Sequence, residues 1–360
     1  MYASHVDSCI YAYYAGLLQK HYEEELTARG IVDVPIAYRR LDGKCNIDFA
    51  FEVFDHIRRS DGGVAIAADI SDFFGSMTHA KLKVQWQKLF GEDRLPPDHY
   101  AIFKSVTEYA FVDRDEVFMS LGVSKTQQRN WHQPFCSIDK FRDIIRKQGL
   151  VHKNPALRGI PQGSPISALL SNIYMLDFDV EIKREAEARG AYYRRYSDDI
   201  LLFCKSGDES FFIKLLHDQM GKYDLTYSEG KEQVSVFTTH KGGLIANKPL
   251  QYLGFLFDGQ RNLIRDRTVQ RQKQKAKKAV RSAIRAARKA GAKIIYRRKI
   301  YSQHSHLPDL RKHKESKYGN FYSYVRRCDK QGEVSKSIRR QMKSHWEWLD
   351  RLIVESEKEL

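Results

Sequence analysis

Three aspartates stand beside apolar segments in a pattern that suits metal-dependent chemistry. Asp69 follows the apolar run 64–68, and Asp198 and Asp199 stand between two short apolar segments that predict a β-hairpin. Two or three converging carboxylates are enough to hold two Mg²⁺ ions about 4 Å apart, an arrangement that assists phosphoryl transfer. Alone, an aspartate pair in a turn is weak evidence, because turns favour aspartate for backbone reasons.

The elements that must position these acids form an α+β pattern. We expect helices over 5–28, 46–57 and 78–90, a strand over 64–68, a helix capped by Ser164 and running to Gly190, a hairpin over 191–203, a strand over 234–237 and a hairpin around 252–255. Further on, Asp266 is expected to cap a long basic helix that runs to Gly291, and a last helix is expected over 338–353.

Four segments resemble the motifs of reverse transcriptases, in family order and at family spacing. They are Ala67–Phe74, Arg158–Tyr174, Tyr196–Asp199 and Tyr252–Phe255. The resemblance implies a right-hand polymerase with fingers, a ferredoxin-like palm built on an antiparallel sheet, and a helical thumb. We therefore expect N-terminal helices and fingers in 1–60, the palm in 61–260 with a fingers insertion at about 91–158, and a basic thumb in 261–360.

The resemblance also assigns roles to the acids. It makes Asp69 and Asp198 the metal ligands, with the backbone carbonyl of Ile70 beside them. Asp199 is the second acid of the Tyr196–Asp199 motif. The expected cofactor is a pair of Mg²⁺ ions, for which Mn²⁺ can substitute.

The nucleotide pocket and the primer grip follow from the same motifs. Phe74 stands where a bulky ring excludes a ribose 2′-hydroxyl, and Gln162 and Gly163 would line the pocket for the incoming dNTP. The remaining candidates are Lys231 at the pyrophosphate, Arg39 or Arg40 at the triphosphate, and Tyr252, Leu253 and Gly254 at the primer. A core phenylalanine and ordinary surface cations are the plainer interpretations of Phe74 and of these basic residues.

All of the excess positive charge lies in the last hundred residues. Residues 261–360 hold 29 Lys and Arg and 10 Asp and Glu, a balance of +19, whereas the chain as a whole carries +16. A solvated basic face is the plain alternative, but clustered cations gain affinity for a polyanion by displacing counterions from its phosphates. We expect contacts with the backbone of an RNA template or an RNA–DNA duplex from Lys273, Lys275, Lys277, Lys278, Arg281 and Arg285.

Other features bear on the cellular location of the protein and on further metal sites. The N-terminus lacks the pattern of a signal peptide, no apolar run is long enough to span a membrane, and the five cysteines are scattered, so we expect a cytoplasmic protein. His304, His306 and His313 are close in sequence, but they lack the Cys or Asp pattern of a metal site. The oligomeric state stays open.

Absences narrow the subfamily. The sequence lacks the extra residue after Gln-Gly of group II intron enzymes, the marks of retron enzymes, and the altered Gln-Gly-Ser-Pro of diversity-generating retroelements. It resembles the "unknown group" of compact bacterial enzymes associated with antiphage defence, which implies copying of a dedicated noncoding RNA or, alternatively, priming from a protein hydroxyl. A mobile-element enzyme of the retron or intron kind and a catalytically silent RNA-binding scaffold remain alternatives.

Overall fold

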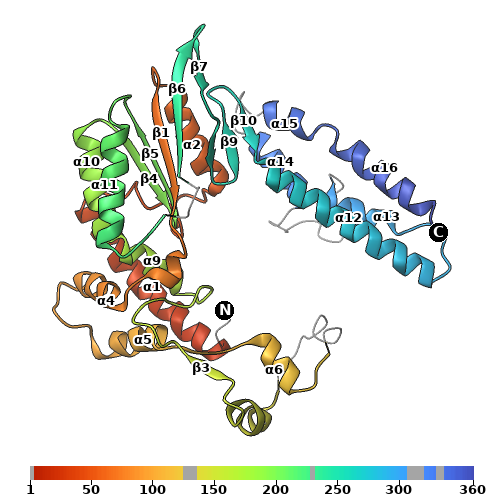
Figure 1. Ribbon diagram of the computed structural model, residues 1–360, viewed down its shortest axis with the longest axis horizontal. Helices are drawn as coiled ribbons and strands as arrows, with labels where there is room; N and C mark the ends of the chain where they lie inside the picture. The colour runs from red at the N-terminus through yellow and green to blue at the C-terminus, as the bar shows by residue number, and fades with distance from the viewer. Residues whose placement is uncertain (1–3, 125–135, 228–231, 306–319, 330–335) are drawn as a thin grey trace.

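The computed structural model describes residues 4–124, 136–227, 232–305, 320–329 and 336–360. Figure 1 shows a central sheet flanked by helices, a lobe below it, and a group of helices that extends away from the sheet on one side. The expected helices over 5–28, 46–57 and 78–90 are confirmed as α1 (His5–Ala28), α2 (Asn46–Arg58) and α4 (His79–Lys88).

The central sheet is antiparallel and carries the acids at one end. Its strands, in the order β4-β5-β1-β6-β7, are β4 (Tyr192–Tyr196), β5 (Asp199–Cys204), β1 (Gly63–Asp69), β6 (Gln233–His240) and β7 (Gly243–Ala246). Successive side chains of a strand point to opposite faces. In β1, Ile66 and Ala68 therefore join one hydrophobic core, and Ala65 and Ala67 join the other.

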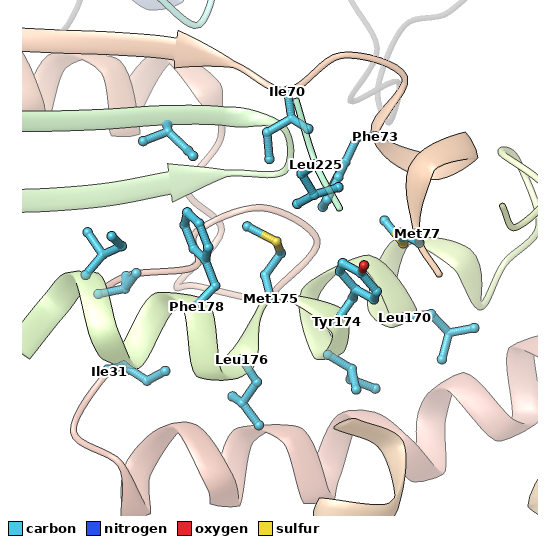
Figure 2. Close-up of a cluster of buried hydrophobic side chains, with 14 of the residues drawn as sticks. Ile31, Ile70, Phe73, Met77, Leu170, Tyr174, Met175, Leu176, Phe178 and Leu225 are labelled. Atoms are coloured by element: carbon cyan, nitrogen blue, oxygen red, sulfur yellow. The ribbon is translucent and has the colours of Figure 1, made fainter. Parts of the chain in front are cut away.

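The first core lies between the sheet and the helices α1, α4, α9 (Ser167–Tyr174), α10 (Leu176–Ala188) and α11 (Glu209–Lys222). Figure 2 shows part of it, with Ile70 and Phe73 on the strand side and Tyr174, Met175 and Phe178 on the helix side. The second core lies on the opposite face, under α2 and the small sheet β10-β9-β8, which comprises β8 (Leu250–Tyr252), β9 (Phe255–Phe257) and β10 (Asn262–Ile264).

The predicted helix from Ser164 to Gly190 is wrong in two respects. Ser164 does not cap it, because the helix begins at Ser167, whose hydroxyl donates to the carbonyl of Pro161 at 2.7 Å. The helix also breaks at Met175, between α9 and α10. The four residues 173–176 are all fully buried, which one straight helix with a single apolar face would not achieve.

Beyond the small sheet the chain is helical. The elements are α12 (Asp266–Lys289), α13 (Arg297–His304), α14 (Phe321–Asp329), α15 (Lys336–Met342) and α16 (His345–Glu357). The long basic helix is confirmed, although Asp266 is its first residue rather than its cap. The last predicted helix is wrong as a single unit, because it is divided into α15 and α16. A third core joins α12, α13 and α16.

The lower lobe is inserted between α4 and α9. It consists of α5 (Pro97–Thr107), β2 (Ala110–Val112), α6 (Arg114–Ser120), α8 (Ile138–Lys140), η1 (Phe141–Arg146) and β3 (Val151–Lys153), with β2 paired to β3. Within the described residues, no helix has the length and apolar character needed to cross a membrane.

Candidate active site

Sheet register brings the three aspartates to one end of the sheet. Asp69, the last residue of β1, lies directly opposite Asp199, the first residue of β5. Asp198 lies in the two-residue turn between β4 and β5, and its carboxyl group is hydrogen-bonded to that of Asp69. The backbone N–H of Ile70 donates to the carbonyl of Asp198 at 3.1 Å, which ties the end of β1 to the turn.

The electrostatics of this pair suit a cation. Burial raises the pKa of Asp198, and the charge of Asp69 adds to the rise, while hydrogen bonds from its own backbone and from Ser197 act in the opposite direction. Two carboxylates in contact repel each other when both are ionised, and a divalent cation relieves that repulsion. Hard oxygen ligands are the ones that Mg²⁺ prefers, so Asp69, Asp198 and a backbone carbonyl fit such an ion.

Asp199 takes a different place from its neighbour. Asp199 is the first residue of β5, and its charge contributes to the raised pKa of the Tyr252 phenol, whose main cause is burial. Among the residues that the structure describes, no group of three or more His, Cys, Asp or Glu side chains is gathered as a metal site. Asp69 thus has Asp198 in contact with its carboxyl group and Asp199 directly opposite it across the β1–β5 pair.

The predicted sugar-discriminating residue lies just beyond β1, in α3 (Phe73–Ser76). Phe73 is buried in the first core, whereas Phe74 is only partly buried. The backbone carbonyl of Phe74 accepts a hydrogen bond of 2.9 Å from the N–H of Ile160. Phe74 is thus tied to the chain segment that leads into the Pro-Gln-Gly motif.

Close backbone packing holds the two motifs together. Gly159 has a φ of +87°, and a Cβ there would lie 3.2 Å from the carbonyl oxygen of Gly75, so a larger residue would be strained at this position. Three and four residues further on, Gln162 and Gly163 are exposed, and Gly163 has a φ of +101°. Backbone contacts of Ile160 with Phe74 and of Gly159 with Gly75 therefore join the segment after β1 to the loop that holds Gln162 and Gly163.

The cations expected at the triphosphate differ in their availability. The Arg39 side chain is 1% exposed, pairs with Glu23 at 2.5 Å and donates to the carbonyl of Pro35 at 2.8 Å. These contacts hold its guanidinium inside the fold, which argues against the predicted role at a triphosphate. Arg40 is exposed and remains a candidate. Lys231 lies outside the described residues.

The segment resembling a primer grip forms the turn between β8 and β9. Leu253 and Gly254 have φ values of +46° and +91°. The carbonyl of Leu253 accepts a hydrogen bond of 3.3 Å from the side chain of Asn46 in α2. Tyr252 is 3% exposed, so its side chain belongs to the core and only the turn itself can face a ligand.

The basic residues predicted to contact a nucleic-acid backbone all lie on α12. Lys275, Lys277, Lys278, Arg281 and Arg285 are exposed, while Lys273 is half-buried with its ammonium 5.3 Å from the ring centre of Trp348. Part of this face borders a cavity of about 530 Å³ between α12 and α16, lined on the α12 side by Lys277, Arg281, Ile284, Arg285 and Arg288. Of the three histidines that are close in sequence, His304 lies in the described part of the chain, whereas His306 and His313 lie outside it.

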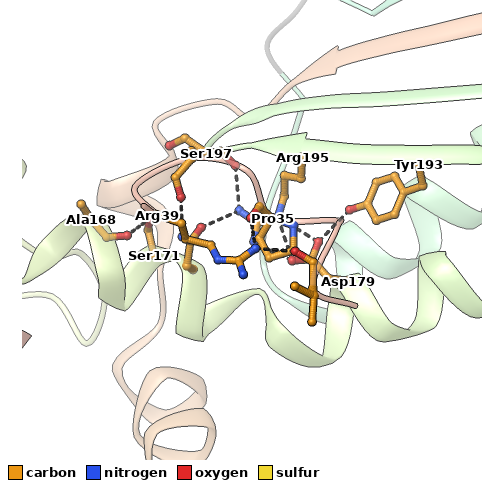
Figure 3. Close-up of polar contacts among 11 residues, drawn as sticks. Pro35, Arg39, Ala168, Ser171, Asp179, Tyr193, Arg195 and Ser197 are labelled. Atoms are coloured by element: carbon orange, nitrogen blue, oxygen red, sulfur yellow. Dashed lines mark hydrogen bonds and ion pairs between the residues drawn. The ribbon is translucent and has the colours of Figure 1, made fainter. Parts of the chain in front are cut away.

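Sequence reasoning missed a buried polar cluster beneath the turn (Figure 3). Arg195 and Asp179 are both 0% exposed and form an ion pair of 2.6 Å, and Tyr193 donates to Asp179 at 2.8 Å. Arg195 also donates to the side chain of Asn172 at 3.2 Å. Arg195 itself could have indicated the cluster, because an arginine in a strand that becomes buried needs a buried partner.

Comparison with known proteins gives one family and a set of distant structural likenesses. The family described as "Reverse transcriptase (RNA-dependent DNA polymerase)" matches residues 51–257, and no curated protein matches the chain. Among solved structures, apo telomerase from Candida tropicalis has 14% identity and a TM-score of 0.41, over 68% of this chain and 39% of that one. Telomerase from Candida albicans in complex with a TWJ fragment of telomeric RNA has 12% identity and a TM-score of 0.41, over 68% and 36%. The present chain thus covers less than half of each telomerase chain.

Proposed function

The chain belongs to the reverse transcriptase family, and we propose that it copies an RNA template into DNA by adding deoxynucleotides to a primer 3′-hydroxyl. The observation that carries this proposal is the contact between Asp69, at the end of β1, and Asp198, in the turn between β4 and β5, next to the register pair of Asp69 and Asp199. A purely architectural palm has no need for two carboxylates that repel each other in this way.

We assign the site residues as follows. Asp69, Asp198 and the Ile70 carbonyl would hold Mg²⁺, with Asp199 as the second acid of the pair. The ion would supply activation of the attacking oxygen and stabilisation of the leaving one. The partly buried ring of Phe74 would exclude a ribose 2′-hydroxyl, and the exposed loop of Gln162 and Gly163 would receive the nucleotide. Arg40 is the available cation for the triphosphate.

Nucleic acid would lie between the palm and α12. On this proposal residues 1–60 contribute N-terminal helices and fingers, 61–260 the palm with its insertion, and 261–360 the thumb. The exposed cations of α12 can contact phosphates of an RNA–DNA duplex without reading sequence.

The decisive experiment is primer extension with purified protein, an RNA template, a DNA primer, dNTPs and Mg²⁺. We expect incorporation by the natural protein and a loss of about 1,000-fold or more in Asp198→Ala, because a charge-stabilising ligand is worth several kcal/mol in the transition state. Binding of the template–primer should persist in this variant. Wild-type protein that binds RNA but incorporates nothing would favour the silent scaffold instead.

Sugar selection tests the nucleotide pocket separately. Phe74→Ala should admit ribonucleotides, because the ring that would meet the 2′-hydroxyl is removed, and the ratio of dNTP to rNTP incorporation should fall. Phe73→Leu, a change in the neighbouring core residue, serves as the control and should leave this ratio unchanged. Unchanged discrimination in Phe74→Ala would remove the assignment.

The finer part of the proposal concerns the biological role. The template is proposed to be a dedicated noncoding RNA, and the enzyme to act in bacterial antiphage defence, on the strength of the sequence resemblance and the basic α12. Sequencing the RNA and DNA that copurify with the protein tests the first point. Phage plating on cells that carry the natural gene or its Asp198→Ala variant tests the second, and equal plating would contradict it.

A further inference from the structure

Ser197, the first residue of the turn between β4 and β5, is held on two sides. It is 2% exposed and has a φ of +59°, a conformation that costs energy for a residue other than glycine. Its hydroxyl is hydrogen-bonded to the Asp198 carboxylate and lies 3.2 Å from the phenol oxygen of Tyr38. Its carbonyl accepts a hydrogen bond of 3.1 Å from Nη1 of Arg195. The hydroxyl and the carbonyl of Ser197 are therefore both hydrogen-bonded, next to the metal-ligand candidate Asp198.

The guanidinium of Arg195 is itself held by Asp179. Its Nε donates to Oδ1 of Asp179 at 2.8 Å, and its Nη2 donates to Oδ2 at 2.6 Å, a two-pronged pairing that sets the plane of the guanidinium. The remaining nitrogen, Nη1, is shared between Asn172 and the carbonyl of Ser197. The direction of the bond to the turn is thus determined by a buried ion pair rather than by a flexible side chain.

Tyr38 reaches the turn through a separate segment of chain. The backbone of this segment pairs with Arg195: the N–H of Ile36 donates to the Arg195 carbonyl, and the N–H of Arg195 donates to the Val34 carbonyl, both at 2.9 Å. The side chain of Asn172 donates to the Ala37 carbonyl at 2.9 Å. Tyr38 follows with a φ of +62° and is 47% exposed, so its ring is positioned by its backbone rather than by burial.

We propose that Arg195 and Tyr38 are positioning residues for the catalytic turn, which hold the carbonyl and the hydroxyl of Ser197 and so place the Asp198 carboxylate against Asp69. The inference rests on the proposed polymerase function. Mg²⁺ demands near-ideal octahedral geometry, and groups that orient a metal ligand matter nearly as much as the ligand. A small displacement of Asp198 would therefore weaken the metal site without altering the nucleic-acid surface.

Tyr38→Phe tests one side by removing a single oxygen from a half-exposed ring. We expect kcat to fall about two- to tenfold, as for the loss of one hydrogen bond, and the Mg²⁺ concentration for half-maximal activity to rise. The KM for dNTP and the affinity for template–primer should stay unchanged. Tyr13→Phe, at a more exposed tyrosine of α1, is the matched control and should behave as the natural protein.

Arg195→Lys tests the other side. The lysine keeps the charge near Asp179 but cannot form the two-pronged pairing and reach Ser197 together, so we expect a loss of about 10- to 100-fold in Mg²⁺ affinity or in activity. The matched control is Arg194→Lys on the same strand. Arg194 pairs with Asp33 instead, and its other hydrogen bond among the described residues goes to the carbonyl of Tyr193 rather than to the turn.

A readout that needs no metal completes the test. Hydrogen exchange, measured without divalent ions, should be faster in Arg195→Lys for the turn and for the Ile70 amide, which bonds Asp198, and should match the natural protein in Arg194→Lys. Tyr38→Phe keeps the idea testable if Arg195→Lys does not fold. Variants with the exchange rates and Mg²⁺ dependence of their controls would overturn the inference. A natural protein that incorporates nothing would instead overturn the proposed function, and the exchange result would still decide the role of the two residues.

Discussion

Several cations in and around the palm are paired with carboxylates, whereas, among the described residues, the cations on α12 are not. In the palm and the N-terminal segment packed on it, Arg195 pairs with Asp179 with both side chains fully buried, Arg39 pairs with Glu23, and Arg194 shares Asp33 with Lys183. On α12 there are ten Lys and Arg and one Asp, and none of these cations lies within ion-pair distance of a carboxylate in the part of the chain described. The paired charges orient elements around the aspartates, and the unpaired ones stay available to a polyanion.

This contrast has an energetic basis. A buried ion pair contributes little net free energy, but it is costly to break, so it fixes geometry. Exposed cations on one helix repel each other slightly, and that repulsion is relieved when phosphates approach and release their counterions. Substitutions should therefore affect folding in the palm and binding on α12.

The largest expected effect on stability is in the palm. Asp179→Ala leaves the buried guanidinium of Arg195 without its partner and should lower the free energy of unfolding by about 3–5 kcal/mol. Asp33→Ala removes a carboxylate that is 45% exposed and should cost less than about 1 kcal/mol. Urea denaturation of both variants measures the difference. Equal costs would mean that burial of the Arg195 pair has no special role.

The next effect in size is on nucleic-acid binding. A triple variant of α12, Lys277→Gln, Arg281→Gln and Arg285→Gln, removes three exposed cations from the face that borders α16. Affinity for an RNA–DNA duplex should fall, and the slope of log affinity against log salt should decrease by about two to three. Stability should change by less than about 0.5 kcal/mol per site, because the side chains are exposed.

The control variant loses the same three positive charges, but from the palm instead of from α12. Lys205, Lys214 and Lys222 are exposed, and Lys205→Gln, Lys214→Gln and Lys222→Gln together remove three charges far along the chain from α12. If this triple variant lowers the salt slope as much as the α12 variant, the effect reflects overall charge rather than a surface on α12.

The acids and most elements were predictable from sequence because local pattern determines them. The continuous apolar run 64–68 specified β1, and the two apolar segments specified the hairpin. The pairing of β1 with β5 then places Asp69 opposite Asp199 and next to the turn that holds Asp198. Period-two alternation places a residue on a face whatever lies far away in the sequence.

What could not be predicted depended on distant partners. The segment ending at Tyr38 pairs with β4, some 160 positions later, and Arg39 turns into the fold toward Glu23. Neither choice is visible in the local pattern, since an arginine beside a motif can equally face solvent. The break at Met175 likewise arises because residues 173–176 are buried from two sides, which requires the sheet and α1 to be in place.

An ion pair between α13 and α16 tests whether paired charges also stabilise the helices that follow the small sheet. Glu357 of α16 accepts a hydrogen bond of 3.1 Å from Nε of Arg297 in α13 and one of 3.0 Å from the N–H of Ile295. The hydrogen bond from Arg297 holds the pKa of Glu357 below its ordinary value of 4.5, although burial acts in the opposite direction. The folded state thus favours the ionised carboxylate.

The sign of the pH dependence follows from this lowered pKa. The stabilisation is present above the unfolded value of 4.5 and is lost as the pH falls through the lower folded pKa. Because Arg297 is 41% exposed, Glu357→Gln should cost no more than about 1 kcal/mol at pH 7, and the difference from the natural protein should shrink below pH 4.5. Denaturant unfolding at several pH values measures it, with exposed Glu347→Gln as the control. A difference that does not depend on pH would mean that Glu357 acts through packing, and that paired charges stabilise only the palm.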